Sequence, residues 1–288
     1  MSNSSATEGR AWLALYALLC GGSVALALLL ALAHSVGALG WPPRASLDGS
    51  GWRALVADGG FWLSCGYSLA LTIVTLTLAL ACALLLLAVL GDRLRHGWLA
   101  RVLFLPLAVP PVVAALIGFT LLSDSGLLSR ISHVLGWTAT PAAFPALIFD
   151  AGGRGIVLMH LTMVTPLFVL VFDRLQAQLR VPLLMQQAKA LGASPYQAWR
   201  RVALPLLLRQ ARPVIAVYGI ALLGAYELPL LLGAAHPSMV SVTIQRALGG
   251  YDLAQRPYGY AMASVYLALL IAGWALVTWR ASSRVVHD

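Results

Sequence analysis

The chain has 288 residues, of which 60% are hydrophobic and only 10% are charged, and its mean hydropathy is +0.84. A soluble domain carries about 25% charged residues, so this chain lacks the polar side chains that would cover a water-soluble fold. The composition also excludes a disordered chain, a collagen-like repeat and a coiled coil. It predicts an all-α membrane protein that crosses the bilayer several times.

Six stretches are apolar and long enough to span a bilayer, which takes about 20 residues. In chain order they are residues 11–36, 61–90, 99–122, 155–172, 211–233 and 260–279. The first has a possible signal-peptidase site at Ala31-Leu32-Ala33. Its apolar part is too long for a secretory signal, however, and Glu8 offsets Arg10, so we expect an uncleaved helix.

The distribution of charge predicts the orientation of these spans. If both termini are cytoplasmic, the inner segments hold 13 basic and four acidic residues, whereas the outer loops hold six basic and five acidic residues. Basic residues collect in cytoplasmic loops, so both termini are expected there. This topology accounts for the net charge of +9 without a nucleic-acid partner.

Catalytic and metal chemistry find little support in the sequence. Lys189, the single lysine, does not stand in the Gly-Lys-Ser/Thr pattern of a phosphate-binding loop, so the chain has no such route to ATP hydrolysis. The cysteines Cys20, Cys65 and Cys82 lie in apolar stretches and form neither a disulfide framework nor a metal site. We expect no catalytic residue, no bound metal and no cofactor on this chain.

The predicted cytoplasmic loop between the fourth and fifth spans has a pattern of its own. Pro182 suits the first position of a helix, and Gly192 suits the residue just past the end of that helix. Ser194, with Gln197 three residues later, suits the start of a second helix with a capping box. Pro205 is expected to end that helix. The loop therefore predicts two short helices with a sharp turn at Gly192.

Both helices are expected to be amphipathic. One side of the first would carry Leu183, Gln187, Ala190 and Leu191, and one side of the second would carry Tyr196, Trp199 and Val202. Such a pair either lies on the membrane surface or docks into a groove of a partner protein. The residues alone do not decide between these alternatives.

The same run resembles the EAA loop of binding-protein-dependent ABC transporter permeases, in which Glu-Ala-Ala, three residues and Gly are followed by about eleven further residues and then Leu-Pro. The matching positions are Gln186, Gln187, Ala188, Gly192, Ala193, Ser194, Pro195, Leu204 and Pro205. Residues 106–115 and 223–233 are also similar to the branch of this family that serves polyamines, thiamine, ferric iron and sulfate.

The resemblance implies a permease subunit of an importer in a bacterial inner membrane. Segment 178–205 would sit in a cleft of a separate ATP-binding cassette ATPase dimer, which would hold ATP and Mg, and would follow it as it closes. A second permease subunit, identical or homologous, and an extracytoplasmic solute-binding protein would complete the transporter. The implied division of the chain is a first helix and outer loop (1–60), the permease domain (61–280) and a cytoplasmic tail (281–288).

One departure from the family pattern is Gln186, which stands where the EAA loop has Glu. A carboxylate would offer a charged acceptor to a basic residue of the ATPase, and charge-assisted hydrogen bonds are roughly twice as strong as neutral ones. The resemblance therefore predicts either weaker docking or an ATPase that has changed to match.

Glu227 is the single acid inside a predicted span, where a carboxylate usually faces a cavity or a partner. It lies 16 residues after Ala211, or about 24 Å along the helix, in the outer third of the membrane. The following proline is expected to kink the helix. Either Glu227 lines a substrate path, or it is paired within the bundle or reaches interfacial water. The candidate path residues are Glu227, Tyr226, Pro229, Pro110 and Pro111.

Prolines 106, 110 and 111 are expected to break the third span in its inner half, for packing or for lining a pore. His160 is expected to be a hydrogen-bonded core histidine. Glu227 and several aromatic residues favour a small cation. The resemblance to the branch named above implies a small solute such as a polyamine, thiamine or a related compound. The alternatives are a secondary transporter, which needs an internal repeat, and an intramembrane enzyme, which needs a catalytic pair or metal at depth; we find neither signal.

Overall fold

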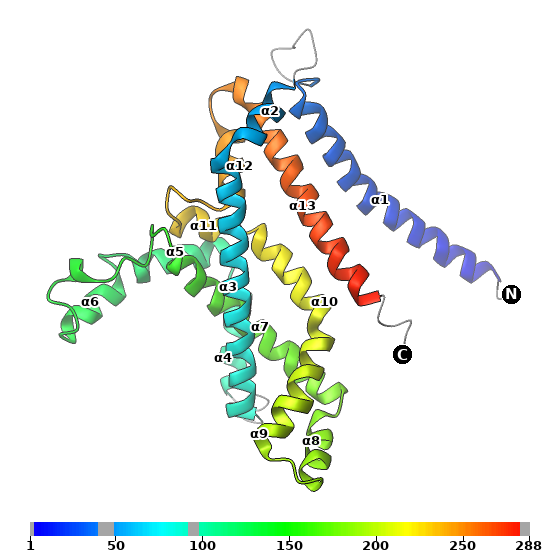
Figure 1. Cartoon of the computed structure of the whole chain (residues 1–288), viewed down its shortest axis with the longest axis vertical. Helices are drawn as coiled ribbons and strands as arrows, with labels where there is room; N and C mark the ends of the chain where they lie inside the picture. The colour runs from blue at the N-terminus through cyan, green and yellow to red at the C-terminus, as the bar shows by residue number, and fades with distance from the viewer. Residues whose placement is uncertain (1–2, 40–48, 92–97, 283–288) are drawn as a thin grey trace. The chain divides into compact units, whose positions relative to one another are not determined.

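The computed structural model describes residues 3–39, 49–91 and 98–282, and within these ranges it contains helices and turns but no strand. The all-α prediction is therefore confirmed. The longest helices are α1 (Asn3–Ser35), α3 (Gly59–Leu90), α7 (Arg154–Gln178) and α13 (Arg256–Ser282) (Figure 1). The predicted tail falls largely outside the described residues.

Five segments of the described chain are long and apolar enough to cross a membrane: Ala14–Ser35, Gly59–Leu90, Pro111–Val134, Arg154–Gln178 and Pro195–Leu223. They overlap the first five predicted spans, and α13 covers the sixth. The prediction of a polytopic membrane protein is therefore confirmed.

The chain divides into two compact units, Met1–Trp62 with Thr243–Ala272, and Leu63–Val242 with Gly273–Asp288. The smaller unit contains α1, α2 (Ser50–Ala57), the short turn η4 (Leu253–Gln255), and parts of α12 (Val240–Gly249) and α13. Here Tyr258 donates a hydrogen bond to the Asp58 carboxylate, and the Trp52 indole donates to the Ser35 hydroxyl at 3.0 Å. These contacts join the ends of α1, α2 and α13.

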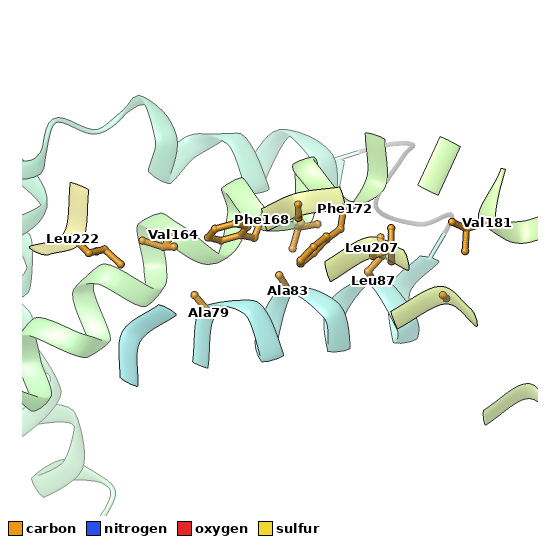
Figure 2. Packing of buried hydrophobic residues seen from close by; sticks show 12 residues of the cluster. Ala79, Ala83, Leu87, Val164, Phe168, Phe172, Val181, Leu207 and Leu222 are labelled. Atoms are coloured by element: carbon orange, nitrogen blue, oxygen red, sulfur yellow. The ribbon is translucent and has the colours of Figure 1, made fainter. Parts of the chain in front are cut away.

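The larger unit has two separate hydrophobic cores. The first combines α3, α7 and α10 (Leu204–Leu223) with the loop between the last two (Figure 2). Phe168 and Phe172 of α7 are completely buried there, with ring centroids 6.0 Å apart. Its other buried members are Ala79, Ala83, Leu87, Val164, Val169, Val181, Ala203, Leu207, Ala211 and Leu222.

The second core combines α5 (Pro111–Leu122) and α11 (Glu227–Leu232) with the first turns of α7 and with Leu71 of α3. Gly118 of α5 makes this packing possible. A Cβ at this position would lie only 2.7 Å from Cγ of Met159 and 3.1 Å from Cδ1 of Leu232. The remaining helices of the unit are α4 (Trp98–Ala108), α6 (Leu127–Val134), the turn η2 (Pro141–Ala143), α8 (Val181–Ala190), α9 (Pro195–Ala198) and the π-helical turn η3 (Trp199–Ala203).

The third predicted span is interrupted at Pro110 and Pro111, as expected, but not at Pro106. Helix α4 continues through Pro106 to Ala108, and the break falls at Val109 and Pro110, in the middle of the span. Pro110 is extended (ψ 144°) because the ring of the next proline disfavours helical geometry in the residue before it. Pro111 then begins α5, where its missing N–H costs nothing.

The fifth predicted span, 211–233, was wrong at both ends. The chain is helical from Pro195 to Leu223 without interruption, and the helix stops at Gly224, whose N–H caps the carbonyl of Ile220 at 3.0 Å. Residues 224–226 are not helical, and α11 follows. The expected kink at Pro229 is also wrong, because the interruption precedes Glu227 and Pro229 lies in the first turn of α11, where no N–H is needed.

Candidate functional site: the cytoplasmic loop and the interrupted spans

Helix α8 begins one residue before the predicted start. Arg180 precedes it in a left-handed conformation (φ 50°), and Pro182 occupies the first turn, as predicted. Val181 is fully buried in the first core and fixes the start of the helix to α7 and α10. The loop is thus attached to the spans at its base.

The turn at Gly192 has the geometry of a Schellman motif. The N–H of Gly192 donates to the carbonyl of Lys189 at 2.9 Å, and the N–H of Ala193 donates to the carbonyl of Ala188 at 3.0 Å. Gly192 has φ 92°, a conformation that residues with a Cβ rarely adopt. The predicted sharp turn at this residue is confirmed.

The predicted capping box at the second helix is also confirmed. The N–H of Gln197 donates to the Ser194 hydroxyl at 3.2 Å, and the Gln197 side-chain oxygen accepts from the Ser194 N–H at 3.0 Å. These two bonds satisfy N–H groups that a helix start leaves without partners. Helix α9 therefore starts where the sequence predicts.

The prediction that Pro205 ends the second helix is wrong. Helix α9 continues through the π-helical turn η3, in which the N–H of Leu204 donates to the carbonyl of Trp199, five residues earlier. The wider turn relieves the clash that a proline ring makes with the carbonyl four residues before it. Pro205 can therefore lie in the first turn of α10, and the second helix of the loop is continuous with a span.

One side of this loop packs on the first core and the other is open. Ala198 and Ala203 are buried, and Met185 and Trp199 pack against the core. Of the predicted coupling residues, Gln186, Gln187, Gly192, Ser194, Pro195 and Pro205 are exposed, whereas Ala188, Ala193 and Leu204 are half-buried. The open side also carries apolar side chains, with Leu191 89% exposed and Tyr196 66% exposed.

The candidate path residues lie at the two interruptions. Pro110 and Pro111 are exposed at the start of α5, and Glu227 is exposed at the start of α11, which packs along α5. Tyr226 is half-buried, but Pro229 is buried and so presents no open surface. The structure therefore brings the two interrupted elements together.

His160 and Glu227 lie in different environments. The His160 ring is buried, and its Nδ1 donates to the carbonyl of Ile156 at 2.9 Å. The histidine thus has the hydrogen-bonded core role that we expected. The Glu227 carboxylate makes no hydrogen bond or ion pair that the described part of the chain reveals.

Two features of the larger unit were not predicted. The Ser241 hydroxyl donates to the carbonyl of Ala225 in the second interruption, at 2.5 Å, and the Ser68 hydroxyl accepts from the N–H of Val240 at 2.8 Å. An open pocket of about 690 Å³ is also present, and the T-shaped pair Phe119 and Phe149 is part of its lining. Partners so distant in sequence leave no local signal. Within the described ranges, no group of three or more His, Cys, Asp or Glu is arranged to hold a metal ion.

Comparison with known proteins gives a match that includes both the cytoplasmic loop and most of the spans. Residues 77–281 match the model of the family described as binding-protein-dependent transport system inner membrane component. The chain belongs to this family. The resemblance inferred from the EAA loop is thereby confirmed, and the chain is a multi-pass inner-membrane permease of the ABC importers, a subunit that is not itself an enzyme.

Two solved structures have a similar fold. One is a bacterial ABC transporter involved in the import of the acidic polysaccharide alginate, with 17% identity and a TM-score of 0.66 over 98% of this chain and 99% of that one. The other is a bacterial alginate ABC transporter in complex with an alginate pentasaccharide-bound periplasmic protein, with 17% identity and a TM-score of 0.56 over 92% and 93% of the chains. No curated protein matches the sequence.

Proposed function

We propose that this permease forms part of the solute path of an importer and couples that path, through segment 178–205, to a separate ATP-binding cassette ATPase dimer. ATP and Mg bind to that partner. A second permease subunit completes the path, and both termini of the chain face the cytoplasm. An extracytoplasmic solute-binding protein delivers the solute, in keeping with the complex reported for the bacterial alginate transporter.

The observation that carries this proposal is the continuity of the loop with a span. Helix runs unbroken from Pro195 to Leu223, a length of 29 residues or about 43 Å. Its first turns form one half of the exposed loop, and its middle, with Leu207 and Ala211, is buried against α3 and α7. A movement imposed on the loop by a partner therefore tilts α10, in the manner of hinge-type closure transmitted through a packed interface.

The open side of the loop provides the docking surface. Leu191 and Tyr196 are exposed apolar side chains on either side of the Gly192 turn, and the amides of Gln186 and Gln187 in α8 are also exposed. A mixed apolar and amide surface suits a groove in a protein partner. With Gln186 in place of the family's Glu, the contact uses neutral hydrogen bonds, and Gln186→Glu is expected to strengthen binding to an ATPase that offers a basic residue there.

The solute path runs past the two interrupted spans. Glu227 is exposed beside half-buried Tyr226, and the start of α5 is exposed next to α11. A carboxylate and an aromatic ring together favour a small organic cation, such as a polyamine or thiamine. The alginate transporters named above import an acidic polysaccharide, but at 17% identity the similarity extends to the fold alone.

Uptake measurements test the path, and copurification tests the coupling. Glu227→Gln is expected to reduce uptake of radiolabelled spermidine or thiamine while the variant still purifies with the ATPase. Asp124→Asn, which removes an exposed acid between α5 and α6, is the matched control and is expected to leave uptake unchanged. Normal uptake by Glu227→Gln would exclude the path role, and purification without any ATPase would exclude the coupling role.

A further inference from the structure

The interruption between α10 and α11 leaves backbone groups that need partners. In a membrane-embedded protein an unpaired N–H or carbonyl is costly, because no water is available in the hydrocarbon region. The N–H groups of Gly224 and Ala225 bond to the carbonyls of Ile220 and Leu222, at 3.0 and 3.2 Å. The carbonyl of Ala225 accepts the hydroxyl of Ser241, which comes from the first turn of α12.

Ser241 is held in position by a second serine. The residue before it, Val240, is fully buried and donates its N–H to the hydroxyl of Ser68 in α3 at 2.8 Å. Ser68 is itself fully buried, and its hydroxyl donates to the carbonyl of Ser64 at 2.8 Å. Its hydroxyl thus accepts one bond and donates another, so its orientation is fixed.

The segment that leads from α11 to Ser241 is buried near both of its ends, whereas Ala235 and His236 between them are exposed. Ala234 is 6% exposed, Ser238 is 8% exposed and Met239 is 2% exposed, and Met239 belongs to the second core. The chain leaves α11 and returns to the interruption at which α11 began. A continuous series of bonds therefore runs from α3, through Val240 and Ser241, to Ala225.

We propose that Ser68 and Ser241 are positioning residues for the solute path, because they fix the non-helical segment that presents Tyr226 and Glu227. Ala225, the acceptor of the Ser241 bond, is two residues from Glu227. The inference rests on the proposed role of Glu227 in the path and adds the residues that hold it in place.

The other end of α11 has its own support, so loss of the Ser241 bond has a local effect. Leu228 and Leu232 are buried in the second core, and the carbonyl of Leu232 accepts the N–H of Phe149 at 2.8 Å. Without Ser241, the carbonyl of Ala225 loses its partner and the segment 224–226 rearranges, while α11 remains packed. Glu227 is then presented to the solute in a range of positions.

Three variants test this inference. Ser241→Ala removes the hydroxyl, Ser241→Thr retains it, and Ser264→Ala removes a buried hydroxyl of α13 that donates within its own helix, to the carbonyl of Tyr260. For spermidine uptake into proteoliposomes with the assembled transporter, Ser241→Ala is expected to raise KM about tenfold, as for a half-buried carbonyl left without its partner, with little change in Vmax. Ser241→Thr and Ser264→Ala are expected to stay near the wild-type KM.

A double variant separates positioning from general damage. In a Glu227→Gln background, Ser241→Ala is expected to add no further loss, because residues that act through one another are not additive. Hydrogen exchange of residues 222–232 is expected to quicken in Ser241→Ala but not in Ser241→Thr. If Ser241→Ala has a wild-type KM while Glu227→Gln is impaired, the positioning role is overturned but the path role stands. A full additional loss of uptake in the double variant has the same consequence. Normal uptake by Glu227→Gln would overturn the path role itself.

Discussion

Replacing Gly192 with alanine perturbs the loop through the backbone alone. A Cβ at Gly192 meets no atom within 4 Å, so the substitution introduces no clash. Its φ of 92° nevertheless lies in the region that costs a residue with a Cβ about 1–2 kcal/mol. Because 1.4 kcal/mol corresponds to a factor of ten, the turn becomes about 5- to 30-fold less favourable relative to opened conformations.

The assay for this change is binding of the ATPase to the purified permease. In the unbound permease, the segment can relieve the strain by opening the turn. Docking on the ATPase then has to close the turn again, so the apparent Kd is expected to rise by up to about 30-fold. Gly192→Asn is the matched control, since asparagine tolerates left-handed conformations and is expected to recover most of the affinity. Wild-type affinity for Gly192→Ala, or an equal loss for Gly192→Asn, would refute the reasoning.

For three further substitutions, the structure predicts the outcome. Ser194→Ala removes the capping box and is expected to destabilise the start of α9 by about 1 kcal/mol, seen as faster hydrogen exchange of Gln197 while α10 stays protected. Phe168→Ala empties a fully buried position of the first core and is expected to lower the free energy of unfolding by about 3–5 kcal/mol, measured by denaturation in detergent. The hydrogen bond from Tyr258 lowers the pKa of Asp58, so the stability it supplies is present above the ordinary aspartate pKa of 3.8 and is lost as the pH falls through the lowered value. In Tyr258→Phe, thermal unfolding should therefore depend less on pH as the pH falls below 3.8; an unchanged acid dependence would contradict this assignment.

The features predicted correctly from the sequence are those decided within a few residues. The turn at Gly192 needs a residue that tolerates positive φ, and the capping box needs only Ser194 and Gln197 at the right spacing. Such local preferences keep their effect when the chain folds, because no distant contact opposes them.

The boundaries of the fifth span could not be predicted in this way. Hydropathy places the start of a span where the apolar run begins, but helical continuity depends on backbone bonds. The helix that contains α10 continues past Arg212, Arg209, Arg201 and Arg200 into the loop. Pro205 is a helix terminator in most contexts and is accommodated here by the π-helical turn, which buried Ala203 holds against the core. At the C-terminal end of the predicted span, the apolar run continues through 224–226, so hydropathy does not indicate that the helix is interrupted there.

The contacts that support the interruption at 224–226 could not be predicted from the sequence, for a different reason. Ser241 bonds to a carbonyl 16 residues away, and Ser68 bonds to an N–H 172 residues away. Serine in an apolar stretch most often bonds within its own helix, as Ser264 does. Nothing in the local pattern distinguishes Ser68 and Ser241 from such serines, so their partners emerge only from the packed structure.

Cysteine cross-linking from the loop tests the central claim most directly. In a variant without its native cysteines, single cysteines at Ala188 and Ser194, which flank the Gly192 turn, are expected to form cross-links to an ATP-hydrolysing subunit, with a yield that changes when ATP is bound. A cysteine at exposed Leu116 of α5 should give no such product. Failure of both loop positions to capture the ATPase, or their labelling by reagents confined to the outside of the cell, would contradict the account.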